Sequence, residues 1–360
     1  MDRMKKSRKI KAVLASCIVL LVIAGIILGV CLYKPWFNGA WNGDFNAQEC
    51  LRITKSGEDL KVLQITDLHV DHTNEQHDKI WKNLDALLQN NDFDLAVVTG
   101  DWTSDEENIP PTEKLIEVMD ACGKPWAVIF GNHDSEGKAT REELADLFLK
   151  AKNCLFAKGP EELSGVGNYV INVYDHEDPD HLDAALFLMD SHYAKAGTMD
   201  YRPLYRDQIK WYERNVDGLQ QAYAGQTGNG AQTLPSLLFI HVPLNEYADG
   251  WEQAKVATEN HLHGSNNEDV YCPYINTGMF RAIEEKQSTK AVFAGHDHAN
   301  TSAVWYHDVL LAYGVQTGVC ETDPYASTMR KGANLITLKD DGTVLVDQIL
   351  TASYPTTTGN

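Results

Sequence analysis

The sequence contains no pair of cysteines in C-x-x-C spacing and no G-x-S-x-G stretch. Thiolate zinc sites commonly use the first pattern and α/β serine hydrolases use the second, so neither kind of site is supported. The seven cysteines are scattered, which leaves the number of disulfides open. Internal repeats and low-complexity tracts are also missing. A repeat architecture is therefore excluded, and the apolar fraction of 43% is that of an ordinary globular protein.

Basic residues are few relative to acidic ones. The chain has 31 Lys and Arg against 51 Asp and Glu, a formal charge of −20. Because residues 1–34 hold seven of the cations and one anion, the rest of the chain carries −26. Such a surface repels nucleic acid and anionic lipid. A phosphate-bearing substrate must then be attracted locally, and bound cations are the obvious means.

One long run without charge extends from Ala12 to Tyr33. About 22 helical residues at roughly 1.5 Å each cross a hydrocarbon core of ~30 Å. A cleaved signal peptide is the alternative, but its apolar region is usually about 7–15 residues and no small-x-small cleavage site follows here. Six cations precede the run and place the N-terminus in the cytoplasm: Arg3, Lys5, Lys6, Arg8, Lys9 and Lys11. We therefore predict a single-pass transmembrane anchor at the cell membrane, with the following domain extracytoplasmic.

Short apolar runs alternate with segments of helical periodicity after the anchor. We expect strands at 60–66, 95–100, 125–131, 169–174, 184–190, 236–242, 290–295, 302–306, 309–314 and 333–338. We expect helices at 77–90, 112–122, 141–151 and around 207–216. The alternation favours an α/β fold with a parallel sheet and helices outside it. The later strands favour a second sheet packed on the first.

The expected organisation has five parts: a basic tail 1–11, the anchor 12–33, a linker 34–58, one domain 59–352 and a tail 353–360. We predict that two polar stretches, 226–235 and 245–274, are surface insertions.

Carboxylate, imidazole and amide side chains follow five of the expected strands. They stand in the motifs "TDLH", "GD", "GNHD", "HVP" and "GHDH", which supply Asp67, His69, Asp101, Asn132, His133, Asp134, His241, His296 and His298. Ligands of open α/β sheets bind at the carboxyl ends of the strands. The ordered set therefore predicts one functional site at that edge.

The residue types indicate metal chemistry. Mixed carboxylate, imidazole and amide ligands suit borderline divalent ions such as Mn, Fe, Zn or Ni. A carboxylate can bridge two ions about 3.5–4 Å apart, and such a pair binds phosphate and lowers the pKa of bound water towards neutrality. We expect two divalent ions as cofactors.

These five motifs resemble those of the calcineurin-like metallophosphoesterases. Further stretches, "LQITDLH", "PWAVIFGNHD", "LFLMDSH", "NTGMF" and "AVFAGHDH", are similar to the purple-acid-phosphatase-like branch that includes fungal Dcr-type and plant phosphatases. The similarity spans roughly residues 58–350. It implies a four-layer αββα sandwich, in which two packed mixed sheets are flanked by helices.

The resemblance also implies roles for the site residues. It assigns two ligand sets that share one carboxylate: Asp67, His69 and His298 for one ion, Asn132, His241 and His296 for the other, and Asp101 for both. His133 would be the general acid, held by Asp134. Purple enzymes carry a tyrosine three residues after the bridging aspartate. Because Ser104 stands there, we expect two divalent ions and no tyrosinate–iron(III) centre.

The combined prediction is a membrane-anchored phosphohydrolase that cleaves phosphomonoesters or phosphodiesters by attack of hydroxide held at the two ions. Its substrate would be a small molecule, a lipid headgroup, a cell-wall intermediate or a phosphoprotein, and the acidic charge argues against nucleic acid. The alternative is a non-catalytic metal-binding scaffold at the cell surface. The presence of His133 beside a full ligand set favours the enzyme. His261 and His263 are a second, weaker candidate metal site.

Overall fold

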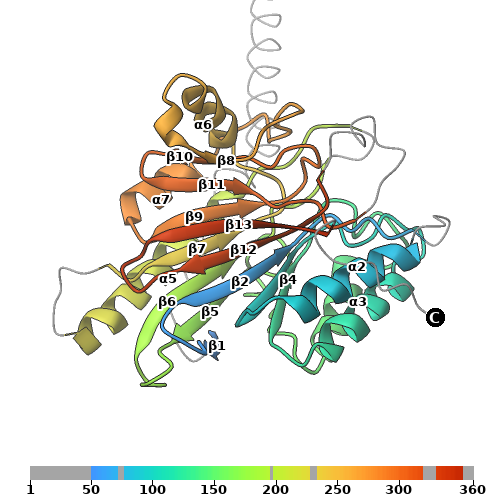
Figure 1. Ribbon diagram of the computed structural model, residues 1–360, viewed down its shortest axis with the longest axis horizontal. Helices are drawn as coiled ribbons and strands as arrows, with labels where there is room; N and C mark the ends of the chain where they lie inside the picture. Colours follow the sequence, from blue (N-terminus) through green and yellow to red (C-terminus); the bar gives the residue numbers. More distant parts are fainter. Residues whose placement is uncertain (1–49, 72–76, 195–197, 228–232, 319–329, 352–360) are drawn as a thin grey trace, which may run out of the picture.

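Two β-sheets lie face to face in the computed structural model, which describes residues 50–71, 77–194, 198–227, 233–318 and 330–351 (Figure 1). Across these residues the larger sheet has the order β1 (Leu51–Thr54), β5 (Tyr169–Tyr174), β6 (Leu182–Leu188), β7 (Ser236–Phe239), β9 (Thr289–Ala294), β11 (Val309–Tyr313), β10 (Ala303–Tyr306) and β8 (His261–His263). The smaller sheet has the order β13 (Val344–Leu350), β12 (Gly332–Leu338), β2 (Leu60–Ile65), β3 (Leu95–Thr99) and β4 (Trp126–Ile129).

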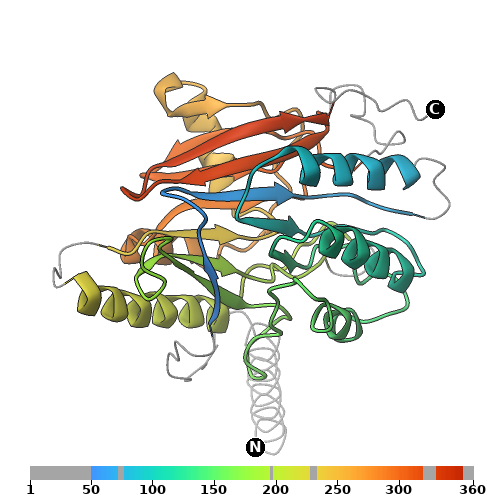
Figure 2. The ribbon, with the colours of Figure 1, turned by 60° about the horizontal axis from the view of Figure 1, so that its bottom comes forward.

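Helices cover the outer faces of both sheets (Figure 2). The smaller sheet carries α2 (His77–Asn90), α3 (Ile109–Ala121) and α4 (Arg141–Phe148), whose buried residues pack on its outer face and belong to one continuous core with the residues between the sheets. The larger sheet carries α5 (Arg206–Thr227), α6 (Glu246–Ala254) and α7 (Met279–Lys286), which share a second core with its outer face. The predicted architecture of two mixed sheets flanked by helices is confirmed.

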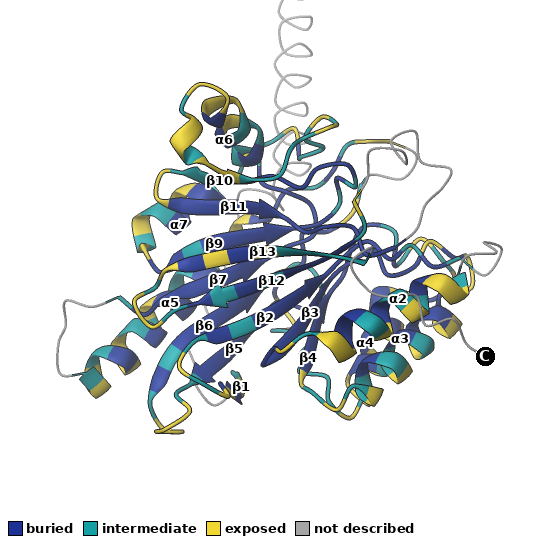
Figure 3. Ribbon diagram, viewed as in Figure 1, coloured by how far each residue is buried: buried dark blue, intermediate teal, exposed yellow. Residues whose placement is uncertain are grey.

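The apolar runs of the sequence are explained by burial on both sides of the sheets. In β7, Leu237 and Phe239 face the core between the sheets, whereas Leu238 faces the helices of the second core. A strand covered on both faces reads as a continuous apolar run, as the sequence does here. Figure 3 shows this burial: the strands are mostly buried, whereas the surrounding helices are exposed on the side that faces away from the sheets. In α2, the helical spacing of the sequence is confirmed, and the buried residues are Ile80, Leu84, Leu87 and Leu88.

Several elements lie where the sequence predicts none. β1 falls inside the expected linker 34–58 and pairs in parallel with β5. The expected insertion 245–274 contains α6, the short 3-10 helix Thr258–Asn260 and β8. α7 and β13 are also additional. β1 and β8 are short, and their backbone groups are satisfied by strands distant in the chain, so local pattern alone does not reveal them.

The predicted anchor 12–33 and both predicted tails lie outside the described residues. Among the helices that are described, none combines the length and apolarity that a membrane crossing needs.

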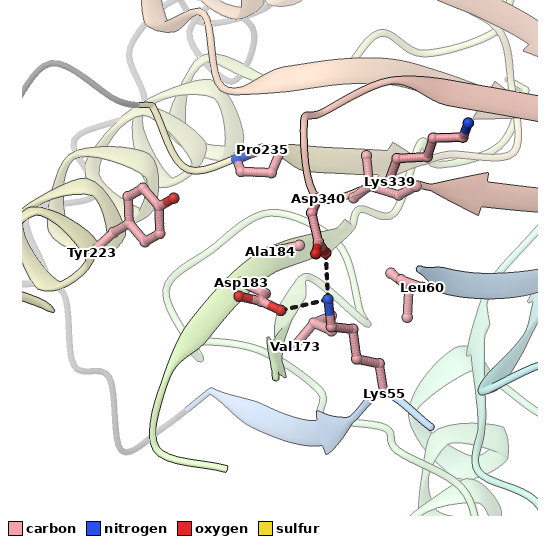
Figure 4. A pocket seen from close by; sticks show the side chains of 10 residues that line it. Lys55, Leu60, Val173, Asp183, Ala184, Tyr223, Pro235, Lys339 and Asp340 are labelled. Atoms are coloured by element: carbon pink, nitrogen blue, oxygen red, sulfur yellow. Dashed lines mark hydrogen bonds and ion pairs between the residues drawn. The ribbon is translucent and has the colours of Figure 1, made fainter. Parts of the chain in front are cut away.

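A buried lysine ties β1 to the domain at the edge of the sheets opposite the carboxyl ends of β2 and β7. Lys55 directly follows β1, and its ammonium group contacts Asp183 at 2.7 Å and Asp340 at 2.5 Å (Figure 4). It also donates to the backbone oxygen of Glu58. Burial lowers the pKa of Lys55, but its hydrogen bonds with the two carboxylates outweigh this and raise the pKa. The lysine therefore stays charged at neutral pH.

Lys55→Met is expected to lower the free energy of unfolding by about 1.5–3 kcal/mol, since it leaves Asp183 without its charged donor. Urea unfolding of the purified protein measures this. Lys61→Met is the matched control, because Lys61 pairs with Asp92 across 2.9 Å at an exposed position. It should change stability by less than ~1 kcal/mol. Equal effects of the two substitutions would contradict a structural role for the buried lysine.

Candidate metal centre

The predicted polar residues converge where the two sheets meet at the carboxyl ends of their parallel strands. β2, β3 and β4 are parallel neighbours in the smaller sheet, and β7 and β9 are parallel neighbours in the larger one. The five motifs follow these five strands. Each sheet thus contributes about half of the cluster, although residues that meet there, such as His69 and His298, are 229 positions apart in the chain.

The first group of candidate ligands joins Asp67, His69 and His298. The Nε2 atoms of the two histidines lie 2.8 Å apart. Asp67 Oδ1 lies 3.7 Å from His69 Nε2 and 3.5 Å from His298 Nε2. Ligand atoms at about 2.0–2.2 Å from one ion are separated by distances of this size. These three side chains are the set that the resemblance assigned to one ion.

The second group joins Asp101, His241 and His296, with Asn132 beside them. His241 Nε2 lies 3.1 Å from both Asp101 Oδ2 and Asn132 Oδ1. Its other ring nitrogen, Nδ1, is 2.8 Å from the backbone oxygen of Thr99, which makes Nδ1 the donor. Nε2 then keeps its lone pair facing the centre, as a metal-binding histidine requires.

Asp101 connects the two groups through one oxygen. Its Oδ2 lies 3.1 Å from His241 Nε2 and 3.6 Å from His69 Nε2. Its Oδ1 accepts the backbone N–H of His133 at 2.8 Å. Burial raises the pKa of Asp101, but the neighbouring imidazoles of His241 and His133 outweigh this and hold the pKa of Asp101 below its ordinary value. The carboxylate is therefore ionised and placed to bridge.

Two buried atoms at the centre lack hydrogen-bond partners among the described residues: Asp101 Oδ2 and His296 Nε2. A buried polar atom without a partner costs about 1–3 kcal/mol. Both atoms are good ligands for borderline divalent ions, and both lie in the second group. The donor set therefore fits two cations, held by the two groups and shared at Asp101.

Backbone strain concentrates at the same residues. Asp67, His69, Asp101 and His296 all have positive φ, at 52°, 47°, 52° and 75°. Such conformations cost energy for residues other than glycine and cluster at functional sites. The glycine of "GNHD" is required by close packing, because a Cβ on Gly131 would lie 2.1 Å from Asp101 Oδ1.

His133 stands at the exposed side of the centre. Its ring centroid is 5.2 Å from that of His69, and its side chain is 38% exposed, so a substrate can reach it. Its Nδ1 is 2.7 Å from Glu136 Oε2. Burial lowers the pKa of His133, but the carboxylates of Asp101 and Glu136 outweigh it and raise the pKa. The ring is placed as a proton donor would be, and the raised pKa favours its protonated form.

Asp134 does not hold His133, which corrects the role expected for it. Its buried carboxylate instead accepts the backbone N–H groups of Gly131 at 2.7 Å, Asp101 at 2.8 Å and Thr103 at 3.2 Å. Burial and the charge of Asp101 raise the pKa of Asp134 to about 7. The adjacent residues point to opposite sides of the turn after β4. Asp134 therefore links the loop that follows β3 to the loop that follows β4. The carboxylate that contacts the His133 ring is that of Glu136.

Glu136 and three other residues near the centre were missed by the sequence reasoning. The spacing of three between His133 and Glu136 within a turn was an available signal. Arg141 forms a buried ion pair with Asp190 and donates to the Gly131 oxygen at 2.6 Å, thereby bracing the turn after β4. The Tyr201 ring lies edge-on to His296, with centroids 4.5 Å apart. Only the tertiary fold brings Arg141, Asp190 and Tyr201 to the site.

The weaker candidate pair is not part of this arrangement. His261 and His263 lie on β8, and neither belongs to the two groups of potential metal ligands found among the described residues. His261 Nε2 is 2.9 Å from the backbone oxygen of Gly264.

Comparison with known proteins supports the reading of the motifs. A family profile described as calcineurin-like phosphoesterase matches residues 60–300, more than half of the chain. The chain belongs to this family. The metallophosphoesterase is 27% identical to "Probable inactive purple acid phosphatase 14" of Arabidopsis thaliana, over 76% of this chain and 74% of the relative. It is also 27% identical to "Phosphatase DCR2" of Saccharomyces cerevisiae, over 73% of this chain but only 48% of that protein.

Solved structures also match the metallophosphoesterase. A dimetal phosphatase from Danio rerio aligns with 80% of this chain and 98% of its own, at 12% identity and a TM-score of 0.48.

Removing divalent ions is expected to lower the melting temperature of the metallophosphoesterase by on the order of 10 °C. Each ion held at about 100 times its Kd adds ~2.7 kcal/mol, and each kcal/mol is worth about 2–4 °C for a domain of this size. Thermal unfolding before and after dialysis against EDTA measures the shift, and added Mn should reverse it. An unchanged melting temperature would mean that the two groups hold no ions.

Proposed function

We propose that this metallophosphoesterase is an active, metal-dependent phosphoester hydrolase. The observation that carries the proposal is the position of Asp101 Oδ2, which is buried between the two ligand groups and within 3.6 Å of a histidine in each. A shared carboxylate is what a two-ion centre needs. The family membership supports the same reaction class.

Two divalent ions at this centre would bind the phosphate and lower the pKa of bound water. The chain itself supplies the proton for the leaving group. Because His133 Nδ1 is engaged by Glu136, its Nε2–H is the free donor, at the exposed side of the centre. A positioned acid of this kind assists any leaving group that departs as a poor anion. His133 can therefore serve phosphomonoesters and phosphodiesters alike.

We also propose that the domain is extracytoplasmic and attached to the membrane by residues 12–33. The support is in the sequence, where six cations precede an uncharged run of about 22 residues. Protease treatment of intact cells tests this. Digestion of the domain while a cytoplasmic marker survives is expected, and complete protection of the domain would contradict it.

The second candidate is a non-catalytic metal-binding scaffold. It is favoured by one observation, that the relative from Arabidopsis thaliana is named a probable inactive phosphatase. Against it stand the complete ligand set and His133, which a scaffold does not need. Turnover decides between the two candidates.

The test is hydrolysis of 4-nitrophenyl phosphate and bis(4-nitrophenyl) phosphate by the purified protein with Mn. We expect turnover of at least one ester, loss of turnover with EDTA, and recovery when Mn is restored. The ratio of the two rates separates monoester from diester preference and so narrows the proposed substrates: small molecules, lipid headgroups, cell-wall intermediates or phosphoproteins. Hydrolysis that persists in EDTA would exclude the metal mechanism, and bound metal without turnover would favour the scaffold.

A further inference from the structure

An apolar cavity of about 310 Å³ is lined in part by Val70, the residue that follows the candidate ligand His69, and we call it the Trp81 pocket. Its apolar lining consists of Val70, Trp81 on α2, and Pro110 and Pro111 in the first turn of α3. A volume near 300 Å³ is at the lower end of the range for small-molecule sites, and such sites are predominantly apolar. The cavity is large enough for an aromatic ring system.

The walls of the Trp81 pocket are held in place by contacts beneath them. The two prolines have fixed φ and begin α3 without needing a backbone donor. The same turn is fastened by the Trp102 Nε1–H, which donates to Thr112 Oγ1 at 2.9 Å. The Asn108 side chain donates to the backbone oxygen of Asp134 at 2.8 Å. A pocket with such walls is pre-formed, so a ligand that enters it loses little free energy to ordering the protein.

The pocket and the metal centre share the same two loops. Val70 follows the candidate ligand His69, and its backbone N–H donates to the Trp102 oxygen at 3.0 Å. The His69 N–H donates to the Asp101 oxygen at 2.9 Å. Thr103 Oγ1 adds a third hydrogen bond between the two loops by donating to the Val70 backbone oxygen at 2.9 Å. The pocket is therefore built onto the backbone that carries two of the metal-facing side chains.

The charges around the pocket do not suit a second phosphate. Lys114 is engaged by Glu117 at 2.7 Å, and the lining also includes two acidic residues, Asp105 and Glu107. A group with no net charge and a large apolar surface fits better, and the Trp81 indole favours a ring that can stack on it or meet its edge.

We infer that the Trp81 pocket receives the organic group of the substrate, and that this group is an aromatic ring system whose phosphoester lies at the metal centre. The inference rests on the proposed function. It narrows the substrate class to phosphoesters with an apolar, ring-bearing alcohol portion and disfavours phosphosugars and simple alkyl phosphates.

The test compares 2-naphthyl phosphate with phenyl phosphate, whose leaving groups have similar acidity but different size. In the full-length protein with Mn, we expect kcat/KM to favour the naphthyl ester by about tenfold. Trp81→Ala should bring the ratio near one. Trp305→Ala, a half-buried tryptophan on β10 of the other sheet, is the matched control and should keep it. Glu107→Phe, at an exposed position of the lining, should block the pocket and also remove the preference, without depending on the packing of α2.

Binding supplies a second measurement that does not depend on turnover. Calorimetry with two non-hydrolysable ligands, 2-naphthylmethylphosphonate and benzylphosphonate, should give about tenfold tighter binding of the former in the parent protein and no preference in the two pocket variants. If neither ester is hydrolysed but this pattern of binding appears, the proposed function fails and the pocket stands. If both esters are hydrolysed and the variants keep the parent ratios of rate and affinity, the pocket inference is overturned.

Discussion

Asp101→Asn is expected to lower kcat/KM for phosphoester hydrolysis by more than about 100-fold. This exceeds the roughly 10–100-fold loss that is typical when a residue that only hydrogen-bonds to a metal ligand is replaced. The amide keeps the shape of the side chain and the bond from the His133 N–H to its oxygen. It removes the negative charge and one lone-pair oxygen from the position between the two ligand groups. Both ions then lose their shared ligand, and the repulsion between them is no longer compensated. Steady-state kinetics with Mn measures the loss.

Metal content separates this effect from unfolding. We expect the Asn variant to retain about one ion or fewer per chain by elemental analysis, with the fold intact by circular dichroism. Asp207→Asn is the control, because Asp207 is a buried carboxylate that accepts from Ser164 at the start of α5 and belongs to neither ligand group. It should keep both ions and activity. Full activity in Asp101→Asn would falsify the bridging role.

His133→Gln is expected to lower kcat by about 10²–10⁴-fold for esters with poor leaving groups, the range found when a general acid is removed. The effect should be much smaller for 4-nitrophenyl phosphate, whose leaving group departs without a proton. Comparing an alkyl phosphate with the nitrophenyl ester in the same variant measures this. A loss of the same size for both esters would mean that His133 binds the phosphate and does not protonate the leaving group.

The pH profile gives a further check on His133. Its pKa is raised, despite burial, by the carboxylates of Asp101 and Glu136. A general acid must be protonated, so activity on the alkyl ester should fall as the pH rises through that pKa. The Gln variant should lose this alkaline decline, while any decline caused by the metal ligands at low pH remains, because protonated histidines do not bind metal.

The helices and strands that were predicted well are those whose local pattern agrees with their burial. The helical spacing of 77–90 coincides with α2, and the apolar runs before the site motifs coincide with β2, β3, β4, β7 and β9. Elements that are held mainly by distant partners were missed. β1 is a strand because β5 pairs with it, and Lys55 is buried because Asp183 and Asp340 converge on it from elsewhere in the chain.

The identity of the candidate ligands could be proposed from residue type and order, but their partners could not. His133 and Asp134 are adjacent in sequence, and pairing them was a reasonable expectation. The turn after β4 separates them, so that Asp134 binds three backbone N–H groups while Glu136 meets the imidazole. Side-chain direction within a turn depends on φ and ψ at each residue, and motif letters do not specify these angles.

The sequence by itself determined the class of chemistry, because carboxylates, imidazoles and an amide after successive apolar runs have few other uses, and motif order is a property of the chain. The tertiary structure alone showed that the side chains of each assigned set lie close enough to share an ion, that Asp101 Oδ2 lies between the two groups, and that Val70, next to His69, lines a pocket together with Trp81. These are distances between segments far apart in the chain. They are set by how two twisted sheets pack against each other, and local patterns carry no information on that packing.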